Sequence, residues 1–168
     1  MTTLTESLAA IFSRELTTLR MEIEAYPTDA ALWRMLPGIA NSGGTLALHL
    51  TGNLQHFIGA VLGKSGFVRN RDAEFALRNL SRAELVRQTE AAKAVVSQTL
   101  QALDPAHLQE PYPEPVAKVQ LDTGDFLVHL SAHLSYHLGQ LDYHRRIVTG
   151  GVPLGGALSP TRLASASG

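Results

Sequence analysis

The sequence predicts an all-α protein built as a four-helix bundle. Four stretches of roughly 18 to 27 residues carry apolar side chains at spacings of three and four, which is the period of a helix with one buried face. No stretch of any length alternates apolar and polar residues as a half-buried strand does. Proline and glycine separate the four stretches, so each predicted helix ends at a recognisable breaker. Periodicity alone leaves the packing order of the helices open.

The first two helices are predicted over residues 5–26 and 45–62. Pro27 ends the first, and the loop that follows it contains Pro37 and three glycines. Gly63 closes the second helix. The apolar face of the first helix is expected to comprise Leu8, Ile11, Phe12, Leu16, Leu19 and Ile23.

The third and fourth helices are predicted over residues 82–103 and from about 122 to 149. The segment before the third is polar and irregular in pattern, and Ser81 and Glu84 then have the spacing of a capping box. Several prolines between residues 105 and 115 predict an extended connection to the fourth helix. Asp122 and Asp125 place negative charge at the start of that helix, where the helix dipole favours it.

Length and composition favour one soluble domain. A chain of 168 residues suits a single domain, which we expect over residues 1–150, followed by a flexible, Gly- and Ser-rich tail over residues 151–168. The net charge is −1 and no dense basic cluster occurs, so nucleic acid is a poor candidate as partner. The start of the chain lacks the features of a secretory signal, and no apolar run is long enough to span a membrane. We therefore expect a cytoplasmic protein.

Histidines concentrate in the predicted fourth helix. His133 and His137 lie one turn apart on one face, and His49 lies on the inward face of the second helix. The chain has no cysteine, so any metal must be held by His, Asp or Glu. Three imidazoles from two helices can hold one divalent ion and leave a coordination position open for water or substrate. Two other interpretations stay open: these histidines are hydrogen-bonded core groups, or the pair is His129 and His133.

Other polar residues have less specific interpretations. Asn53 and Gln140 can orient a ligand or make ordinary interhelix hydrogen bonds. Asp122, Asp125 and Glu74 are candidate general bases by chemistry only, and a helix cap or a solvated charge explains each of them better.

The remaining histidines and the single tryptophan are assigned mainly structural roles. His56 is interpreted as a polar group or a partner of a metal ligand, and His144 as a charge that favours the helix dipole. His107 lies in a loop and is assigned no role. Trp33 is expected to anchor the first connection to the bundle, or to form the wall of a pocket.

Two segments resemble a known protein family. The segments LALHLTGNLQHFIG and HLSYHLGQ are similar to those of the DinB/YfiT-like superfamily of bacterial four-helix-bundle proteins, and GNLQHFIGAVLG and NRDAEF resemble one uncharacterised branch of it. The likeness spans about residues 5 to 150. It implies a long connection between the second and third helices, zinc or nickel bound by His49, His133 and His137, and a homodimer.

The resemblance and the open coordination position together predict a metal-dependent enzyme acting on a small molecule. Some members of the superfamily are thiol-dependent transferases or isomerases, which implies an S-transferase with a low-molecular-weight thiol as cosubstrate; a hydrolase is also considered. Leu134 follows His133 where a zinc protease has Glu, so peptide hydrolysis is disfavoured. The alternative is a metal-binding or structural dimeric bundle without catalytic activity.

Overall fold

The structure is a computed structural model that describes residues 2–155 and 158–167. Over these residues the fold is all-helical, with isolated β-bridges and no strand, so the predicted all-α class is confirmed. Four long helical segments account for most of it: α1 (Leu4–Glu24), α3 (Gly43–Leu54) continued by η1 (Gln55–Leu62), α5 (Arg82–Ala102) and α6 (Thr123–Thr149).

Two further α-helices lie in the connections, where the sequence pattern predicted none. They are α2 (Asp29–Leu32) and α4 (Arg71–Ala76). Two short 3₁₀ segments also occur: η2 (Pro105–Gln109) shortly after α5, and η3 (Pro160–Arg162) in the C-terminal segment that follows α6. The segment before α5 is therefore not irregular throughout. The side chain of Asn70 accepts a hydrogen bond from the backbone N–H of Ala73 at 3.0 Å, which caps α4. A six-residue helix is too short to carry the apolar periodicity on which the prediction relied.

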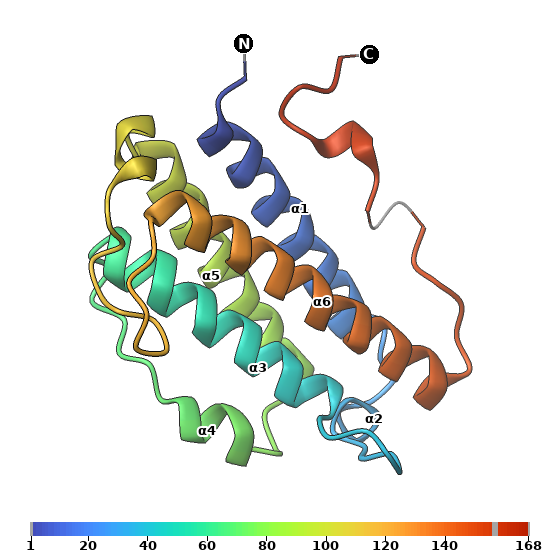
Figure 1. Ribbon diagram of the computed structural model, residues 1–168. Helices are drawn as coiled ribbons and strands as arrows, with labels where there is room; N and C mark the ends of the chain where they lie inside the picture. The colour runs from blue at the N-terminus through green and yellow to red at the C-terminus, as the bar shows by residue number, and fades with distance from the viewer. Residues whose placement is uncertain (1, 156–157, 168) are drawn as a thin grey trace.

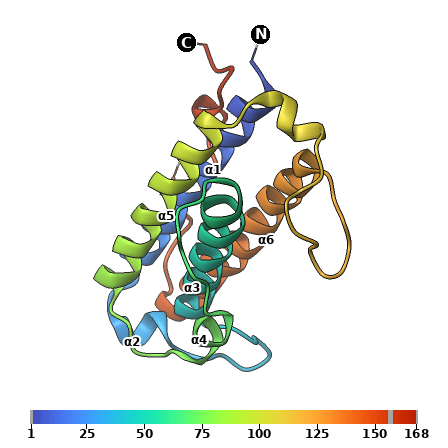
Figure 2. The same ribbon diagram turned by 90° about the vertical axis from the view of Figure 1, so that its left-hand side faces the viewer.

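The long helices pack side by side around one apolar core (Figure 1; Figure 2). Helix α1 contacts α5 and α6, and α3 contacts α5 and α6 from the other side. The predicted face of α1 supplies much of this core, because Leu8, Phe12, Leu16, Leu19 and Ile23 are all buried. Each such side chain stabilises the fold by about 1.5–3 kcal/mol relative to its exposed state.

The second predicted helix changes geometry along its length. Helix α3 passes directly into η1, a π-helix in which the backbone is wound more widely. Two glycines allow η1 to approach α5 closely. A Cβ at Gly59 would lie 2.6 Å from Cγ1 of Val95, and one at Gly63 would lie 2.2 Å from Oγ1 of Thr99. Larger residues at these positions would push the two helices apart.

The ends of the fold are marked by conventional caps. Thr3 and Glu6 form a capping box at the start of α1. Gly150 ends α6 in the left-handed conformation with φ of +65°. The predicted flexible tail begins here; residues 156, 157 and 168 lie outside the described part of the chain, while η3 contacts α1.

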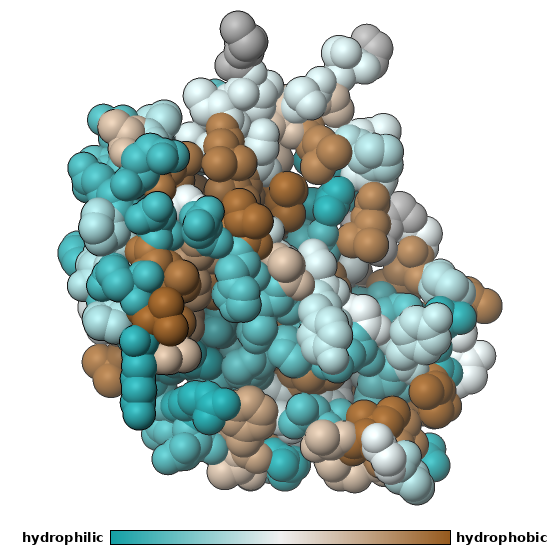
Figure 3. All heavy atoms as spheres, in the orientation of Figure 1, coloured by the Kyte–Doolittle hydropathy of each residue, from teal (hydrophilic) through white to brown (hydrophobic). Residues whose placement is uncertain are grey.

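The surface carries both hydrophilic and hydrophobic residues on the face seen in Figure 1. Figure 3 shows hydrophilic residues over much of the middle of this face, with the hydrophobic residues in separate patches. Among the described residues, no helix combines the length and the apolar character needed to cross a membrane.

Candidate metal centre

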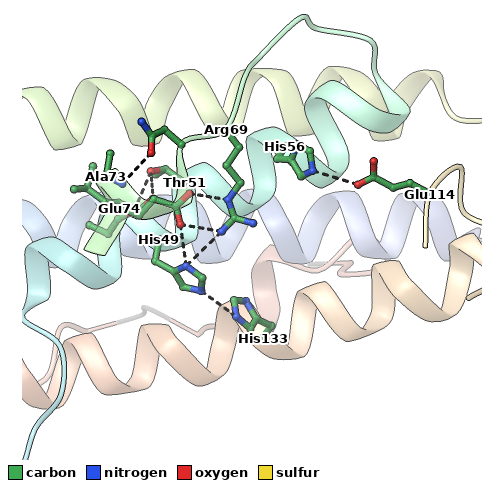
Figure 4. A network of polar contacts seen from close by, with 11 residues as sticks. His49, Thr51, His56, Arg69, Ala73, Glu74, Glu114 and His133 are labelled. Carbon is green, nitrogen blue, oxygen red and sulfur yellow. Dashed lines mark hydrogen bonds and ion pairs between the residues drawn. The ribbon is translucent and has the colours of Figure 1, made fainter. Parts of the chain in front are cut away.

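His49 occupies the middle of α3, the most completely buried helix of the fold. All twelve residues of α3 are buried, and His49 itself is 8% exposed. A polar ring in this position needs partners, because an unpaired buried polar group costs free energy. Figure 4 shows that the ring of His49 lies between Glu74 on one side and His133 of α6 on the other.

The three imidazoles predicted as ligands lie together. One ring nitrogen each from His49, His133 and His137 can be chosen so that all three lie within 4.8 Å of one another. The ring centroids of His133 and His137 are 4.6 Å apart, and that of His49 lies 5.2 and 5.3 Å from them. Helix α6 places its two rings one turn apart, and packing of α3 against α6 brings in the third.

Glu74 determines which nitrogen of His49 carries the proton. Its Oε2 lies 3.1 Å from Nδ1 of His49, and an ionised carboxylate can only accept. The shorter contact of Nδ1 is therefore the one in which Nδ1–H donates to Glu74, since Nη2 of Arg69, itself a donor, lies farther away at 3.5 Å; in this neutral tautomer Nε2 of His49 faces His133. A carboxylate that accepts from the far side of an imidazole is the usual partner of a metal-ligating histidine.

Arg69 keeps Glu74 in its ionised form. Burial raises the pKa of Glu74, but hydrogen bonds from Arg69 and His49 outweigh burial, and the pKa lies below its ordinary value. The guanidinium binds the carboxylate in a bidentate manner, with Nε–Oε1 at 2.7 Å and Nη2–Oε2 at 2.8 Å. The charge of the buried carboxylate is thus balanced within the protein.

His137 has a corresponding partner on its own helix. Its Nδ1 lies 2.6 Å from Oε1 of Gln140, an acceptor, so Nε2 of His137 is also left free as a ligand atom. The pKa of His137 lies below its ordinary value. Burial and the proximity of His49 lower it, and the hydrogen bond with Gln140 only partly offsets them. Burial, together with repulsion from His137 and His49, lowers the pKa of His133 to about 4. Both rings are therefore neutral at pH 7, as metal ligands must be.

The distance between the two facing nitrogens fits a shared cation. Nε2 of His49 and Nε2 of His133 lie 3.3 Å apart. Two nitrogens bound to one tetrahedral ion at about 2.0–2.1 Å lie about 3.4 Å apart. Without an ion, only a proton on His133 can separate the two lone pairs. Nδ1 of His133 is buried and has no hydrogen-bond partner among the described residues, so this ring, unlike those of His49 and His137, has no acceptor on its far side.

Comparison with known families identifies the family of the chain. A family model described as the DinB superfamily matches residues 11–141. The chain belongs to the DinB superfamily. A search of curated proteins returns no match.

Several residues of this member of the DinB superfamily have roles other than those predicted. Glu74 is neither a solvated charge nor a free base, because His49 and Arg69 occupy its carboxylate. His144 does not act as a charge at the helix end: Nδ1 contacts the hydroxyl of Tyr26 at 2.7 Å and Nε2 donates to the carbonyl of Arg34 at 2.8 Å. The pKa of His144 lies below its ordinary value, because the effect of burial exceeds the opposing effect of the hydrogen bond to the carbonyl of Arg34.

The other histidines of this DinB-superfamily chain lie outside the cluster of three. His129 is exposed and stacks on Phe126, with ring centroids 6.0 Å apart. His56 contacts Glu114 at 3.2 Å, in agreement with a polar role. The alternative pair of His129 and His133 is therefore not the one that meets His49.

The remaining predicted residues divide between structural and polar roles. Trp33 anchors the first connection, because its Nε1–H donates to the carbonyl of Leu80 at 2.8 Å and its ring packs on the core. Asn53 is buried, but its Oδ1 has no partner among the described residues. Asp122 and Asp125 lie exposed at the start of α6, at least two turns from His133, so neither is near enough to act as a base there.

The pattern of the sequence did not reveal Arg69. It lies in the segment that the sequence analysis described as irregular, twenty residues from His49. Only the folding of α4 onto α3 brings it to the site. The segment NRDAEF, which carried part of the family resemblance, begins directly after Arg69 and was the available signal.

Proposed function

We propose that the chain binds one divalent metal ion, zinc or nickel, through His49, His133 and His137, within a four-helix bundle whose long connection contains α4. The observation that carries the proposal is the separation of 3.3 Å between Nε2 of His49 and Nε2 of His133. Hydrogen bonds hold the Nδ1 atoms of His49 and His137 on the other side of each ring. With Nδ1 turned to a partner, Nε2 of each of these two rings is the atom available to an ion.

We further propose that the site is catalytic and that the reaction is a thiol-dependent S-transfer. Three protein ligands leave a coordination position open, which distinguishes catalytic from structural zinc sites. A bound divalent ion would lower the pKa of a coordinated thiol or water and polarise a substrate carbonyl. His133 and His137 are partly exposed, so a small substrate can approach from the α6 side. An external thiol suits a chain without cysteine.

Metal content tests the first part of the proposal. Protein purified without a nickel column should contain close to one equivalent of zinc or nickel by elemental analysis. The His137→Ala variant should lose this metal, whereas His129→Ala, which removes an exposed histidine outside the cluster, should keep it. Equal metal content in the two variants would exclude His137 as a ligand.

Turnover tests the second part. The metal-loaded protein should catalyse addition of a low-molecular-weight thiol to an electrophilic substrate, and chelation should abolish the reaction. A metal-loaded protein that shows no turnover across a panel of thiols and electrophiles would instead support a metal-binding bundle without catalytic activity.

A further inference from the structure

We propose that Glu74 is the positioning residue of the metal centre, and that it reaches His49 because Gly52 leaves room for it and Arg69 holds it there. This inference rests on the proposed function for its metal readout. It assigns to three residues outside the ligand set a single task, which is to fix His49 as a ligand through Nε2.

Gly52 provides the space. It follows His49 by three residues on α3, so the two positions lie on neighbouring parts of one helix face. A Cβ built on Gly52 would lie 2.2 Å from Oε1 of Glu74 and 2.9 Å from its Cδ. Glycine in a helix interior costs about 1 kcal/mol relative to alanine. The close approach of the carboxylate explains why a glycine stands here despite that cost.

Helix α4 carries Glu74 to this space. With six residues, α4 is too short to be stable alone in water and depends on packing against α3. Phe75 contributes to the contact, with its ring centroid 5.1 Å from that of His49. Glu74 is the one residue of α4 that is buried, at 6% exposed. The helix therefore presents a single buried carboxylate to the metal centre.

Arg69 fixes the direction of that carboxylate. Its two hydrogen bonds engage both oxygens, and its guanidinium also lies over the ring of Phe57 at 5.6 Å from the centroid. A bidentate pair has one favoured orientation. Oε2 is consequently held where it accepts from Nδ1 of His49, as the close-up in Figure 4 shows.

A second histidine–carboxylate pair in the same protein serves as a comparison. His56 and Glu114 lie 3.2 Å apart, a distance close to that of His49 and Glu74. The side chain of Glu114 is 42% exposed, against 7% for Glu74. The pair lies outside the cluster of three imidazoles. Substitution of Glu114 therefore controls for loss of a histidine–carboxylate contact as such.

Zinc titration of the metal-free protein tests the proposal. Glu74→Gln and Gly52→Ala should each weaken zinc binding by about 10- to 100-fold, the range found for loss of such outer partners. Glu114→Gln should change the affinity by less than about twofold, and so should Gly139→Ala, because a Cβ at Gly139 meets nothing within 4 Å. The double variant Glu74→Gln/Gly52→Ala should bind zinc no more weakly than whichever single variant binds it less tightly, because both substitutions act through one carboxylate.

The tautomer of His49 supplies a readout that simple destabilisation would not change. In the metal-free wild type, nitrogen NMR should show Nδ1 of His49 protonated and Nε2 unprotonated. Glu74→Gln and Gly52→Ala should each give a mixture of the two tautomers of His49. Thermal unfolding confirms that each variant is folded. Where one variant fails to fold, the other decides. Zinc affinity within twofold of wild type and an unchanged tautomer in a folded variant would overturn the proposal. A wild type that binds no zinc would refute the proposed function, and the tautomer measurement would still decide the role of Glu74.

Discussion

Acidification should destabilise the metal-free protein through His133. Burial, reinforced by repulsion from His137 and His49, lowers the pKa of His133 to about 4, from 6.5 in a free side chain. Between these two pH values the unfolded chain binds a proton that the folded chain rejects. The stability contributed by the neutral ring is therefore complete above about pH 6.5 and is lost as the pH falls toward 4.

The size of the effect follows from the two pKa values. Linkage gives a loss of about 2 kcal/mol between pH 7 and pH 5 for a group whose pKa falls from 6.5 to about 4. His133 is only partly buried, so solvent screens the interactions and about 1 kcal/mol is the better expectation. With a urea m-value of about 2 kcal/mol/M, the unfolding midpoint should shift by about 0.5 M.

Urea unfolding with a chelator present at pH 7 and pH 5 measures this shift. The informative quantity is the drop in midpoint of the wild type minus that of His133→Gln, since other titrating groups contribute to both proteins and cancel. His129→Gln, which removes the exposed histidine one turn earlier, should retain most of the wild-type drop, because repulsion from His129 lowers the pKa of His133 less than burial, His137 and His49 do. Equal drops in the wild type and His133→Gln would show that the ring is not held neutral by burial, and the reasoning would be refuted.

Three further predictions concern stability. Zinc at about 100 times its Kd should stabilise the wild type by about 2.7 kcal/mol, raising the Tm by roughly 5–10 °C in a thermal melt, and should have no such effect on His137→Ala. Gly44→Ala should lower the free energy of unfolding by about 1–3 kcal/mol in urea titrations, since its Cβ would lie 2.6 Å from Cε3 of Trp33; a neutral result would mean that the indole moves freely. Glu22→Gln should cost about 2 kcal/mol by the same measurement, because it removes the buried carboxylate that Nε of Arg145 contacts and leaves the partly exposed Asp142 as the remaining charged partner of Arg145; a loss below about 0.5 kcal/mol would contradict this.

Much of the fold could be predicted because its long helices are amphipathic. The apolar residues of α1 recur with the helical period, and all but Ile11 of the predicted face are fully buried. The ends of the long helices were also predictable, because Ser81 caps α5 and Gly150 adopts the left-handed conformation after α6. Helix α4 was missed because its single turn and a half is stabilised by contacts with α3 rather than by its own pattern.

The candidate site divides in the same way. Spacing along α6 was enough to place His133 and His137 on one face, and Gln140 was a candidate partner from its position. His49 joins His133 and His137 only if its face of α3 packs against α6. The apolar periodicity of α3 turns His49 inward but does not say which helix it faces. The carboxylate of Glu74 lies on the opposite side of His49 from His133, and no local spacing relates residues 49 and 74.

By itself, therefore, the sequence determined an all-helical chain with three histidines suited to a metal, because helical period and residue chemistry are local properties. Tertiary structure decided which polar groups support them. Arg145 illustrates the difference: near the end of α6 its charge suits the helix dipole, yet the folded chain buries it against Glu22 of α1. Such pairings depend on how separate helices pack, and packing is set by the whole core rather than by any one segment.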